Sequence, residues 1–126
     1  MFDDFLGVLP PGVRAAFEFR HVSWHHPDVF ERLRARRLAL CVADSERMTT
    51  PVETTAGYAY FRLRDGGYQP DDIARWAETI AKSAAACRQV FVYFKHEDQG
   101  KGPEFARLFL EALPASAQHP SPRTPL

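Results

Sequence analysis

The chain has 126 residues, 45% of them hydrophobic, and its 16 basic side chains are balanced by 16 acidic ones. This size and composition predict one globular domain, and the zero net charge argues against general electrostatic capture of nucleic acid or an anionic membrane. No apolar run approaches the roughly 18 residues of a membrane span, and the amino terminus carries acids where a signal peptide has bases. We therefore expect a cytosolic protein. Cys41 and Cys87 are too far apart for a metal-ligand motif, so we expect both to be structural.

The chain opens with a short helix followed by a strand. Residues 2–9 place apolar side chains at helical spacing, and Pro10–Gly12 ends this helix. Arg14–Arg20 then alternates as a strand does, with two phenylalanines on one face and Glu18 and Arg20 on the other. In a parallel sheet the phenylalanines would pack against helices, and Glu18 and Arg20 would face inward. These two side chains either belong to a site or form an ion pair that holds the strand end.

The next segment, His21–His26, reads as a loop with Trp24 as its largest side chain, and Pro27 starts a second helix. The arginines of this helix are expected to form a solvated face. The neighbouring His25 and His26 suggest a metal site at first sight. Adjacent residues point apart, however, and His26 stands where a helix cap is expected, so we favour the capping role.

Two more strands occupy the middle of the chain. Leu38–Ala43 is an unbroken apolar run ending at Asp44, and Gly57–Leu63 is an alternating strand. The connection Asp44–Ala56 shows no helical period and is close to the minimum length of a parallel crossover, so we expect it to be irregular. Alternation in the later strand puts three side chains on one face: Tyr58, Tyr60 and Arg62.

The last third of the chain contains a helix, a strand and another helix. The clearest helix begins at Pro70 and has Trp76 in its apolar stripe, which predicts a core position. Val90–Phe94 is an unbroken apolar run rich in β-branched and aromatic residues, typical of a strand buried on both faces. A charged cluster, Lys95–Asp98, follows it, and a glycine-rich turn leads to a helix opening at Pro103.

Four strands alternating with helices predict an α/β fold with a parallel sheet and right-handed crossovers. A complete (β/α)8 barrel takes about 250 residues, so this chain holds four of its eight units, which is half of a TIM barrel. We expect this half-barrel domain to span residues 1–113 and the proline-rich segment 114–126 to be a disordered tail. A four-stranded open sheet with helices on both faces is the competing fold.

Four phrases of the sequence resemble the domain of unknown function 72 family, also called YecE-like proteins. They are FEFRHVSW at Phe17–Trp24, YFRLRDGGY at Tyr60–Tyr68, PDDIARWA at Pro70–Ala77 and VYFKHEDQGKGPEFA at Val92–Ala106. The resemblance runs from about residue 2 to about residue 113. It implies a TIM-barrel protein of roughly twice this length, with no established activity, whose carboxyl-terminal half this chain resembles.

Barrel geometry gathers the polar residues that follow parallel strands at one rim, where ligands bind. The residues predicted to be catalytic are Glu18, Asp44, His96 and Glu97. The residues predicted to bind substrate are Arg20, Trp24, Arg62, Tyr68, Lys95 and Asp98. Arginine binds phosphate or carboxylate through paired hydrogen bonds, and a nearby carboxylate can move a proton. The sequence therefore predicts hydrolase-like chemistry on a phosphorylated or carboxylated small molecule, or on a nucleic-acid phosphodiester.

Two alternatives stay open. A metal-dependent hydrolase could draw its ligands from Glu18, Asp44 and the segment His96–Asp98, but no His-x-His or His-Glu-x-x-His spacing supports one, so we predict no metal. The sequence does not identify a cofactor. A non-catalytic reading starts from the edges near Arg14 and Lys95, because four strands cannot close a barrel and an apolar inner face stays open. The chain would then be a truncated fragment, or a half-barrel that acts only by assembling with itself or with a partner half.

Overall fold

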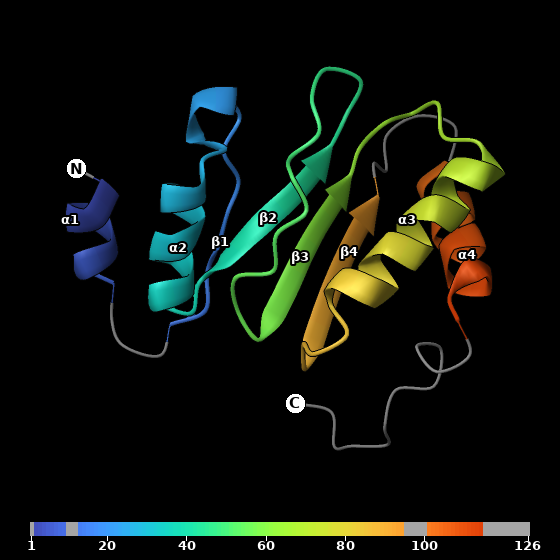
Figure 1. Cartoon of the computed structure of the whole chain (residues 1–126). Coiled ribbons are helices and arrows are strands. Elements are labelled where there is room, and N and C mark those ends of the chain that lie inside the picture. Colours follow the sequence, from blue (N-terminus) through green and yellow to red (C-terminus); the bar gives the residue numbers. More distant parts are fainter. Residues whose placement is uncertain (1, 10–12, 95–100, 115–126) are drawn as a thin grey trace.

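The computed structural model describes residues 2–9, 13–94 and 101–114 (Figure 1). The helices are α1 (Phe2–Gly7), α2 (Pro27–Ala35), α3 (Pro70–Ser83) and α4 (Lys101–Ala112), with a short 3-10 helix, η1 (Val22–Trp24). The strands are β1 (Ala16–Phe17), β2 (Ala39–Asp44), β3 (Tyr58–Leu63) and β4 (Gln89–Phe94). They form one parallel sheet in the order β1-β2-β3-β4. The predicted α/β fold with four parallel strands is confirmed.

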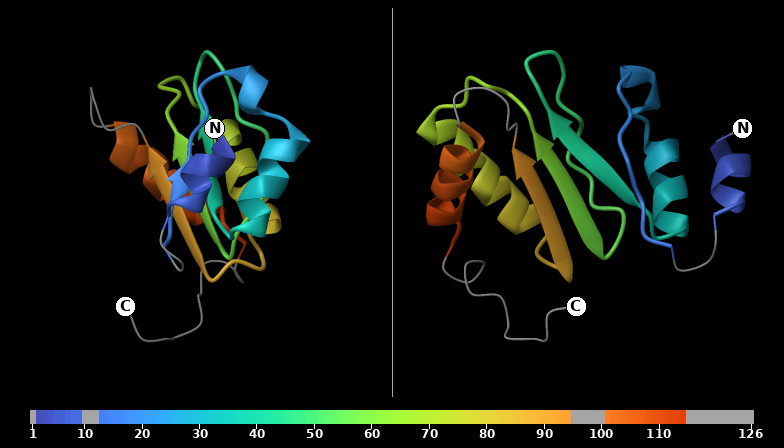
Figure 2. Two further views of the ribbon diagram at one scale, coloured as in Figure 1. Left: turned by 90° about the vertical axis from the view of Figure 1, so that its left-hand side faces the viewer. Right: turned by 180° about the vertical axis from the view of Figure 1, so that it is seen from behind.

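In the part of the chain that the structure describes, helices cover one face of the sheet only. In β3 the side chains of Ala59, Phe61 and Leu63 are buried, while those between them are half-buried. Phe61 pairs in register with Val42 and Val92, so the covered face continues across the neighbouring strands. The edge-on and rear views show the helices on that side and along the ends of the sheet (Figure 2). This arrangement is that of a partial (β/α) barrel in which the connection between β2 and β3 has no helix. Among the described residues, the competing fold with helices on both faces is not formed.

The core lies between the covered face and the helices, as the helical spacing predicts. Its helical members are Val29, Phe30 and Leu33 of α2, Ile73, Ala77 and Ile80 of α3, and Phe105 and Phe109 of α4. Trp76, predicted as a core residue, is half-buried and packs against this cluster. On α4 the last buried side chain is that of Phe109, and Ala112 is exposed.

We call the other side of the sheet the open face. Its residues, from the strand register, are Glu18 after β1, Cys41 and Ala43 of β2, Tyr58, Tyr60 and Arg62 of β3, and Gln89, Phe91 and Tyr93 of β4. The prediction that Val90–Phe94 is buried on both faces is wrong, because no helix of the described residues covers the β4 side chains on this side. Phe91 is 37% exposed and Tyr93 is 46% exposed.

The first strand is shorter than predicted: β1 is residues 16–17 rather than 14–20. After β2 the chain turns at residues 45–48 and returns, and Thr50 donates its N–H to the Ala43 carbonyl oxygen at 2.9 Å. The Thr50 hydroxyl oxygen accepts the Ala43 N–H at 3.2 Å. The backbone N–H and carbonyl oxygen of Ala43 point toward the same edge of β2 as those of Ala39, which lies beside β1. The returning segment therefore occupies the part of this edge that a longer β1 would need.

The β2–β3 connection contains no helix, as predicted, and side chains hold it in place. The Thr55 hydroxyl accepts the Leu40 N–H at 3.0 Å and donates to the Leu38 carbonyl oxygen at 2.7 Å. Glu53 forms an ion pair of 2.5 Å with Arg34 of α2. An extended segment thus fills the layer where a crossover helix would lie, and it can be followed in green in Figure 1.

Two long side chains cross the open face at the amino-terminal end of the sheet. The Tyr58 hydroxyl accepts the Ala15 N–H and donates to the Ala15 carbonyl oxygen, both at 2.8 Å. The Arg14 guanidinium lies 5.6 Å from the centre of the Tyr58 ring and donates to the Gln89 side chain. Residues before β1 therefore touch the start of β4, so the sheet is curved and the open face is its concave side.

The start of α4 and the carboxyl-terminal segment give two further outcomes. Helix α4 begins at Lys101 rather than at Pro103, which lies within its first turn, where the missing proline N–H costs nothing. Residues 115–126, nearly all of the predicted disordered tail, lie outside the described residues. Among the residues that the structure describes, no helix has the length and apolar character needed to cross a membrane.

We expect Thr55→Val to lower the free energy of unfolding by about 2 kcal/mol, because it leaves a buried donor and a buried acceptor of β2 unpaired. Thr79→Val makes the same atomic change on α3, where no such pair depends on it, and should cost no more than about 0.5 kcal/mol. Chemical denaturation of both variants measures the difference. Equal losses would show that Thr55 does not hold the crossover on the sheet.

Candidate functional site

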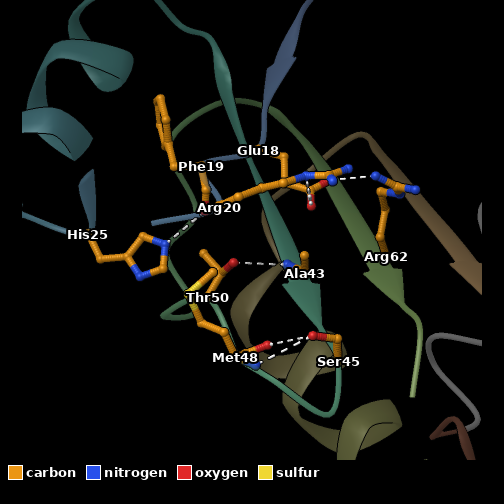
Figure 3. A network of polar contacts seen from close by, with 9 residues as sticks. All are labelled: Glu18, Phe19, Arg20, His25, Ala43, Ser45, Met48, Thr50 and Arg62. Atoms are coloured by element: carbon orange, nitrogen blue, oxygen red, sulfur yellow. Dashed lines mark hydrogen bonds and ion pairs between the residues drawn. The ribbon is translucent and has the colours of Figure 1, made fainter. Parts of the chain in front are cut away.

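Three of the predicted site residues meet on the open face at the carboxyl-terminal edge of the sheet. Arg62 of β3 donates to Glu18 Oε1 at 2.5 Å, and the Arg20 Nε lies 3.4 Å from Glu18 Oε2 (Figure 3). We call Glu18, Arg20 and Arg62 the rim triad. Both predictions made for Glu18 and Arg20 are compatible with this geometry, since they form an ion pair and face the concave side of the sheet.

The rim triad exists because β2 has small residues on the open face. Glu18 and Arg62 belong to strands that are separated by β2, whose open-face residues at this level are Cys41 and Ala43. A larger side chain at either position would stand between the carboxylate and the guanidinium. The small residues let the Arg62 side chain lie across β2 and reach Glu18.

Exposure increases along the rim triad. The side chain of Glu18 is 17% exposed, that of Arg62 is 33% exposed and that of Arg20 is 73% exposed. One carboxylate faces two guanidinium groups, so the cluster carries one net positive charge. A guanidinium has five N–H donors in a planar fork that suits phosphate and carboxylate oxygens. The rim triad is therefore suited to an anionic group arriving from the concave side.

Cys41 lies below the rim triad, and its thiol is protected from ionisation. Burial, reinforced by the charge of Glu18 and partly opposed by Arg62, raises the pKa of Cys41 to about 12. Burial also raises the pKa of the Tyr60 hydroxyl, with a contribution from the neighbouring Tyr93. At neutral pH both groups are therefore protonated.

Asp44 and Tyr68, which we predicted at the same rim, lie on the opposite side of the sheet. Asp44 pairs in register with Leu63, a buried residue of the covered face. The Tyr68 hydroxyl donates to Asp44 Oδ2 at 2.6 Å, and the Thr49 hydroxyl donates to Asp44 Oδ1 at 2.5 Å. Burial, reinforced by Asp44, raises the pKa of Tyr68. The structure thus brings Asp44 and Tyr68 together but does not bring them to the rim triad.

A depression of about 410 Å³ lies beside Asp44 and Tyr68, on the covered side. Its other lining residues are Val52, Asp65, Asp72, Arg75, Trp76 and Thr79. It opens between the extended β2–β3 connection and α3, where a crossover helix would otherwise pack. Sequence reasoning missed this depression. The signal for it was present, because the irregular crossover was predicted and a thin segment leaves the flank of the next helix uncovered.

The aromatic and histidine residues after β1 have structural partners. Trp24 stacks on Phe19 with ring centroids 5.1 Å apart, on the side away from the rim triad. His26 caps α2 by accepting the Asp28 N–H, as predicted, and a ring nitrogen of His25 lies 3.1 Å from the Phe19 carbonyl oxygen. Trp24 is therefore held in a packing cluster rather than placed beside Arg62.

Glu18 and Asp44, two of the residues considered for a metal site, lie on opposite faces of the sheet and cannot share an ion. Within the described ranges 2–9, 13–94 and 101–114, no group of three or more His, Cys, Asp or Glu residues could hold a metal ion. The remaining residues considered for it fall in the segment His96–Asp98, outside the described residues.

Comparison with known proteins identifies the family. The family model described as "Protein of unknown function DUF72" matches residues 1–126. The chain belongs to the DUF72 family. The resemblance inferred from the four sequence phrases is thereby confirmed. A comparison with curated proteins found no match.

Crystal structures of DUF72 proteins share this fold. One from Thermotoga maritima is 22% identical with a TM-score of 0.75, over 87% of this chain and 49% of that chain. One from Enterococcus faecalis is 18% identical with a TM-score of 0.72, over 87% of this chain and 52% of that chain. The chain spans about half the length of these DUF72 structures, and the likeness concerns the fold.

Four predicted site residues of this DUF72 chain lie outside the described residues: Lys95, His96, Glu97 and Asp98. They directly follow β4, the neighbour of the strand that carries Arg62, and Arg62 pairs in register with Tyr93. The roles assigned to them stay predictions.

We predict that Cys41 reacts far more slowly with an alkylating reagent than an ordinary cysteine does. At pH 8 a thiol with a pKa of about 12 is ionised about a thousandfold less than one with a pKa of about 9, and the thiolate is the reactive form. Mass spectrometry of peptides after timed alkylation gives the rate. Alkylation in denaturant, where the burial is lost, should restore an ordinary rate, and rapid labelling of native Cys41 would contradict its buried position.

Proposed function

We propose that this DUF72 chain supplies an anion-binding site at the rim of a (β/α) barrel, in which Arg62 and Arg20 receive a phosphate or carboxylate group. The observation that supports it is the single carboxylate of Glu18 placed between two guanidinium groups, 2.5 Å from Arg62 and 3.4 Å from Arg20. The rim triad keeps one positive charge, at the sheet edge where α/β barrels bind their ligands.

Arg62 is the anchor in this proposal, and Arg20 is the mobile partner. Arg62 is two-thirds buried and held by Glu18, so little side-chain entropy is lost when it binds a ligand. Arg20 is largely exposed and can move toward an incoming anion. Glu18 acts as a positioning residue for both. A phosphorylated or carboxylated small molecule, or a phosphodiester, offers the oxygens that this arrangement recognises.

A hydrolase-like step would need proton transfer beside the bound anion. Glu18 is the carboxylate of the rim triad itself. His96 and Glu97 are the further candidates because they follow β4 in the sequence. Asp44 has no part in this proposal, since its carboxylate faces the covered side and is held there by Tyr68. Trp24 and Tyr68 are likewise left out of the ligand contacts.

A second candidate function is non-catalytic, and the observation that favours it is the uncovered aromatic surface of the open face. A half-barrel of this kind would act by assembling with another half. A cytosolic location, expected from the sequence, suits either function.

The test is a titration of the 126-residue protein with inorganic phosphate, in which the NMR signals of the arginine side chains report binding. We expect saturable binding that Arg62→Met weakens by at least about tenfold, because one charge-assisted hydrogen bond contributes roughly 1.5–3 kcal/mol. Arg20→Met should weaken it by less. Arg75→Met is the matched control, since Arg75 lies on α3 at the depression on the covered side and should leave binding unchanged.

Circular dichroism of each variant checks that the fold is retained. Equal binding by the wild type and the folded Arg62→Met variant would refute the site. Loss of binding in Arg75→Met alone would show that phosphate binds at the depression on the covered side and not at the rim triad.

A further inference from the structure

The open face combines apolar and polar residues in a fixed order along the strands. Its middle is aromatic, with the Tyr60 ring 5.2 Å from that of Tyr93 and 6.1 Å from that of Phe91. The rim triad lies at the carboxyl end, and the contact between Arg14 and Gln89 lies at the amino end. An apolar layer between two polar ends is the pattern of a barrel interior, where side chains from opposite strands fill the centre.

The unpaired parts of this surface lie along β4. Phe91 and Tyr93 are 37% and 46% exposed on the open face, and Val90, on the other face of the same strand, is 40% exposed. In the described part of the chain no strand pairs with the outer edge of β4. An exposed apolar edge strand of six residues favours pairing with another strand. The surface thus requires a strand beside β4 as well as side chains over the open face.

Symmetry identifies an occupant that meets both requirements. A two-fold axis along the barrel axis would place β4 of one copy beside β1 of the other, twice, and keep all eight strands parallel. Such an isologous arrangement closes on itself and gives β4 of each copy a neighbouring strand. This fold matches 49% and 52% of the chains of two DUF72 crystal structures, so each of those chains has about as many further residues.

We propose that the open face is the interface on which a second copy of this chain docks, closing an eight-stranded parallel barrel. The concave curvature shown by the contact between Arg14 and Gln89 suits closure rather than stacking of flat sheets. Two rim triads then face each other across one mouth. This inference does not rest on the anion site, because the aromatic layer and the edge of β4 carry it.

The test is the mass of the 126-residue chain in solution, measured by light scattering after size exclusion between about 1 and 100 μM. We expect a dimer, twice 14.3 kDa, that does not grow further with concentration. Tyr93→Arg and Phe91→Arg should each weaken the dimer by at least about a hundredfold, because they place a charge in the aromatic centre of the interface. Leu110→Arg is the control, since Leu110 is 60% exposed on α4 and should leave the dimer intact.

Hydrogen exchange separates loss of the dimer from loss of the fold. Amides of residues 89–94 should exchange more slowly in the dimer, and this extra protection should disappear in Tyr93→Arg while that of β2 stays. A wild-type protein that stays monomeric at 100 μM overturns the proposal. A dimer broken by Leu110→Arg but not by Tyr93→Arg overturns it too, as does a mass that rises without limit. None of these outcomes changes the phosphate titration of Arg62→Met.

Discussion

Alternate side chains of a strand point to opposite faces, and the helices of the described residues cover only one face of this sheet. This constraint sorts the polar residues at the carboxyl edge. Glu18 and Arg62 belong to the open face and meet there, whereas Asp44 belongs to the covered face and pairs with Tyr68. It also leaves the aromatic residues of β4 exposed. The candidate anion site and the proposed interface are therefore two parts of one uncovered surface.

The strands that carry strong local patterns could be predicted from the sequence, and those that depend on distant partners could not. The predicted ranges for β2 and β3 are within one residue of the observed ones, because apolar runs and alternation are properties of the segment itself. The length of β1 depends on Thr50, which lies more than thirty residues away and takes the same edge of β2. No pattern within residues 14–20 reveals that competition.

The faces of the rim residues show the same limit. Alternation correctly placed Glu18 with Arg20, and Arg62 with the tyrosines of its strand. It could not relate one strand to the next, because that requires the register, and the register turns Asp44 toward the helices beside Leu63. The small side chains of Cys41 and Ala43, unremarkable in the sequence, prove to be what lets Glu18 and Arg62 touch. Residue types predicted the chemistry of the edge, and the register decided which groups share it.

The Tyr58 hydroxyl, which bonds both the N–H and the carbonyl oxygen of Ala15, also bears on the order in which the chain assembles. β1 has only two residues in the ladder, so it gains little by docking on β2 alone. Its attachment becomes favourable once β3 has paired with β2, because the Tyr58 side chain then reaches across β2 to Ala15, 43 residues earlier in the chain. The amino-terminal segment therefore completes its hydrogen bonds only when β3 is in place.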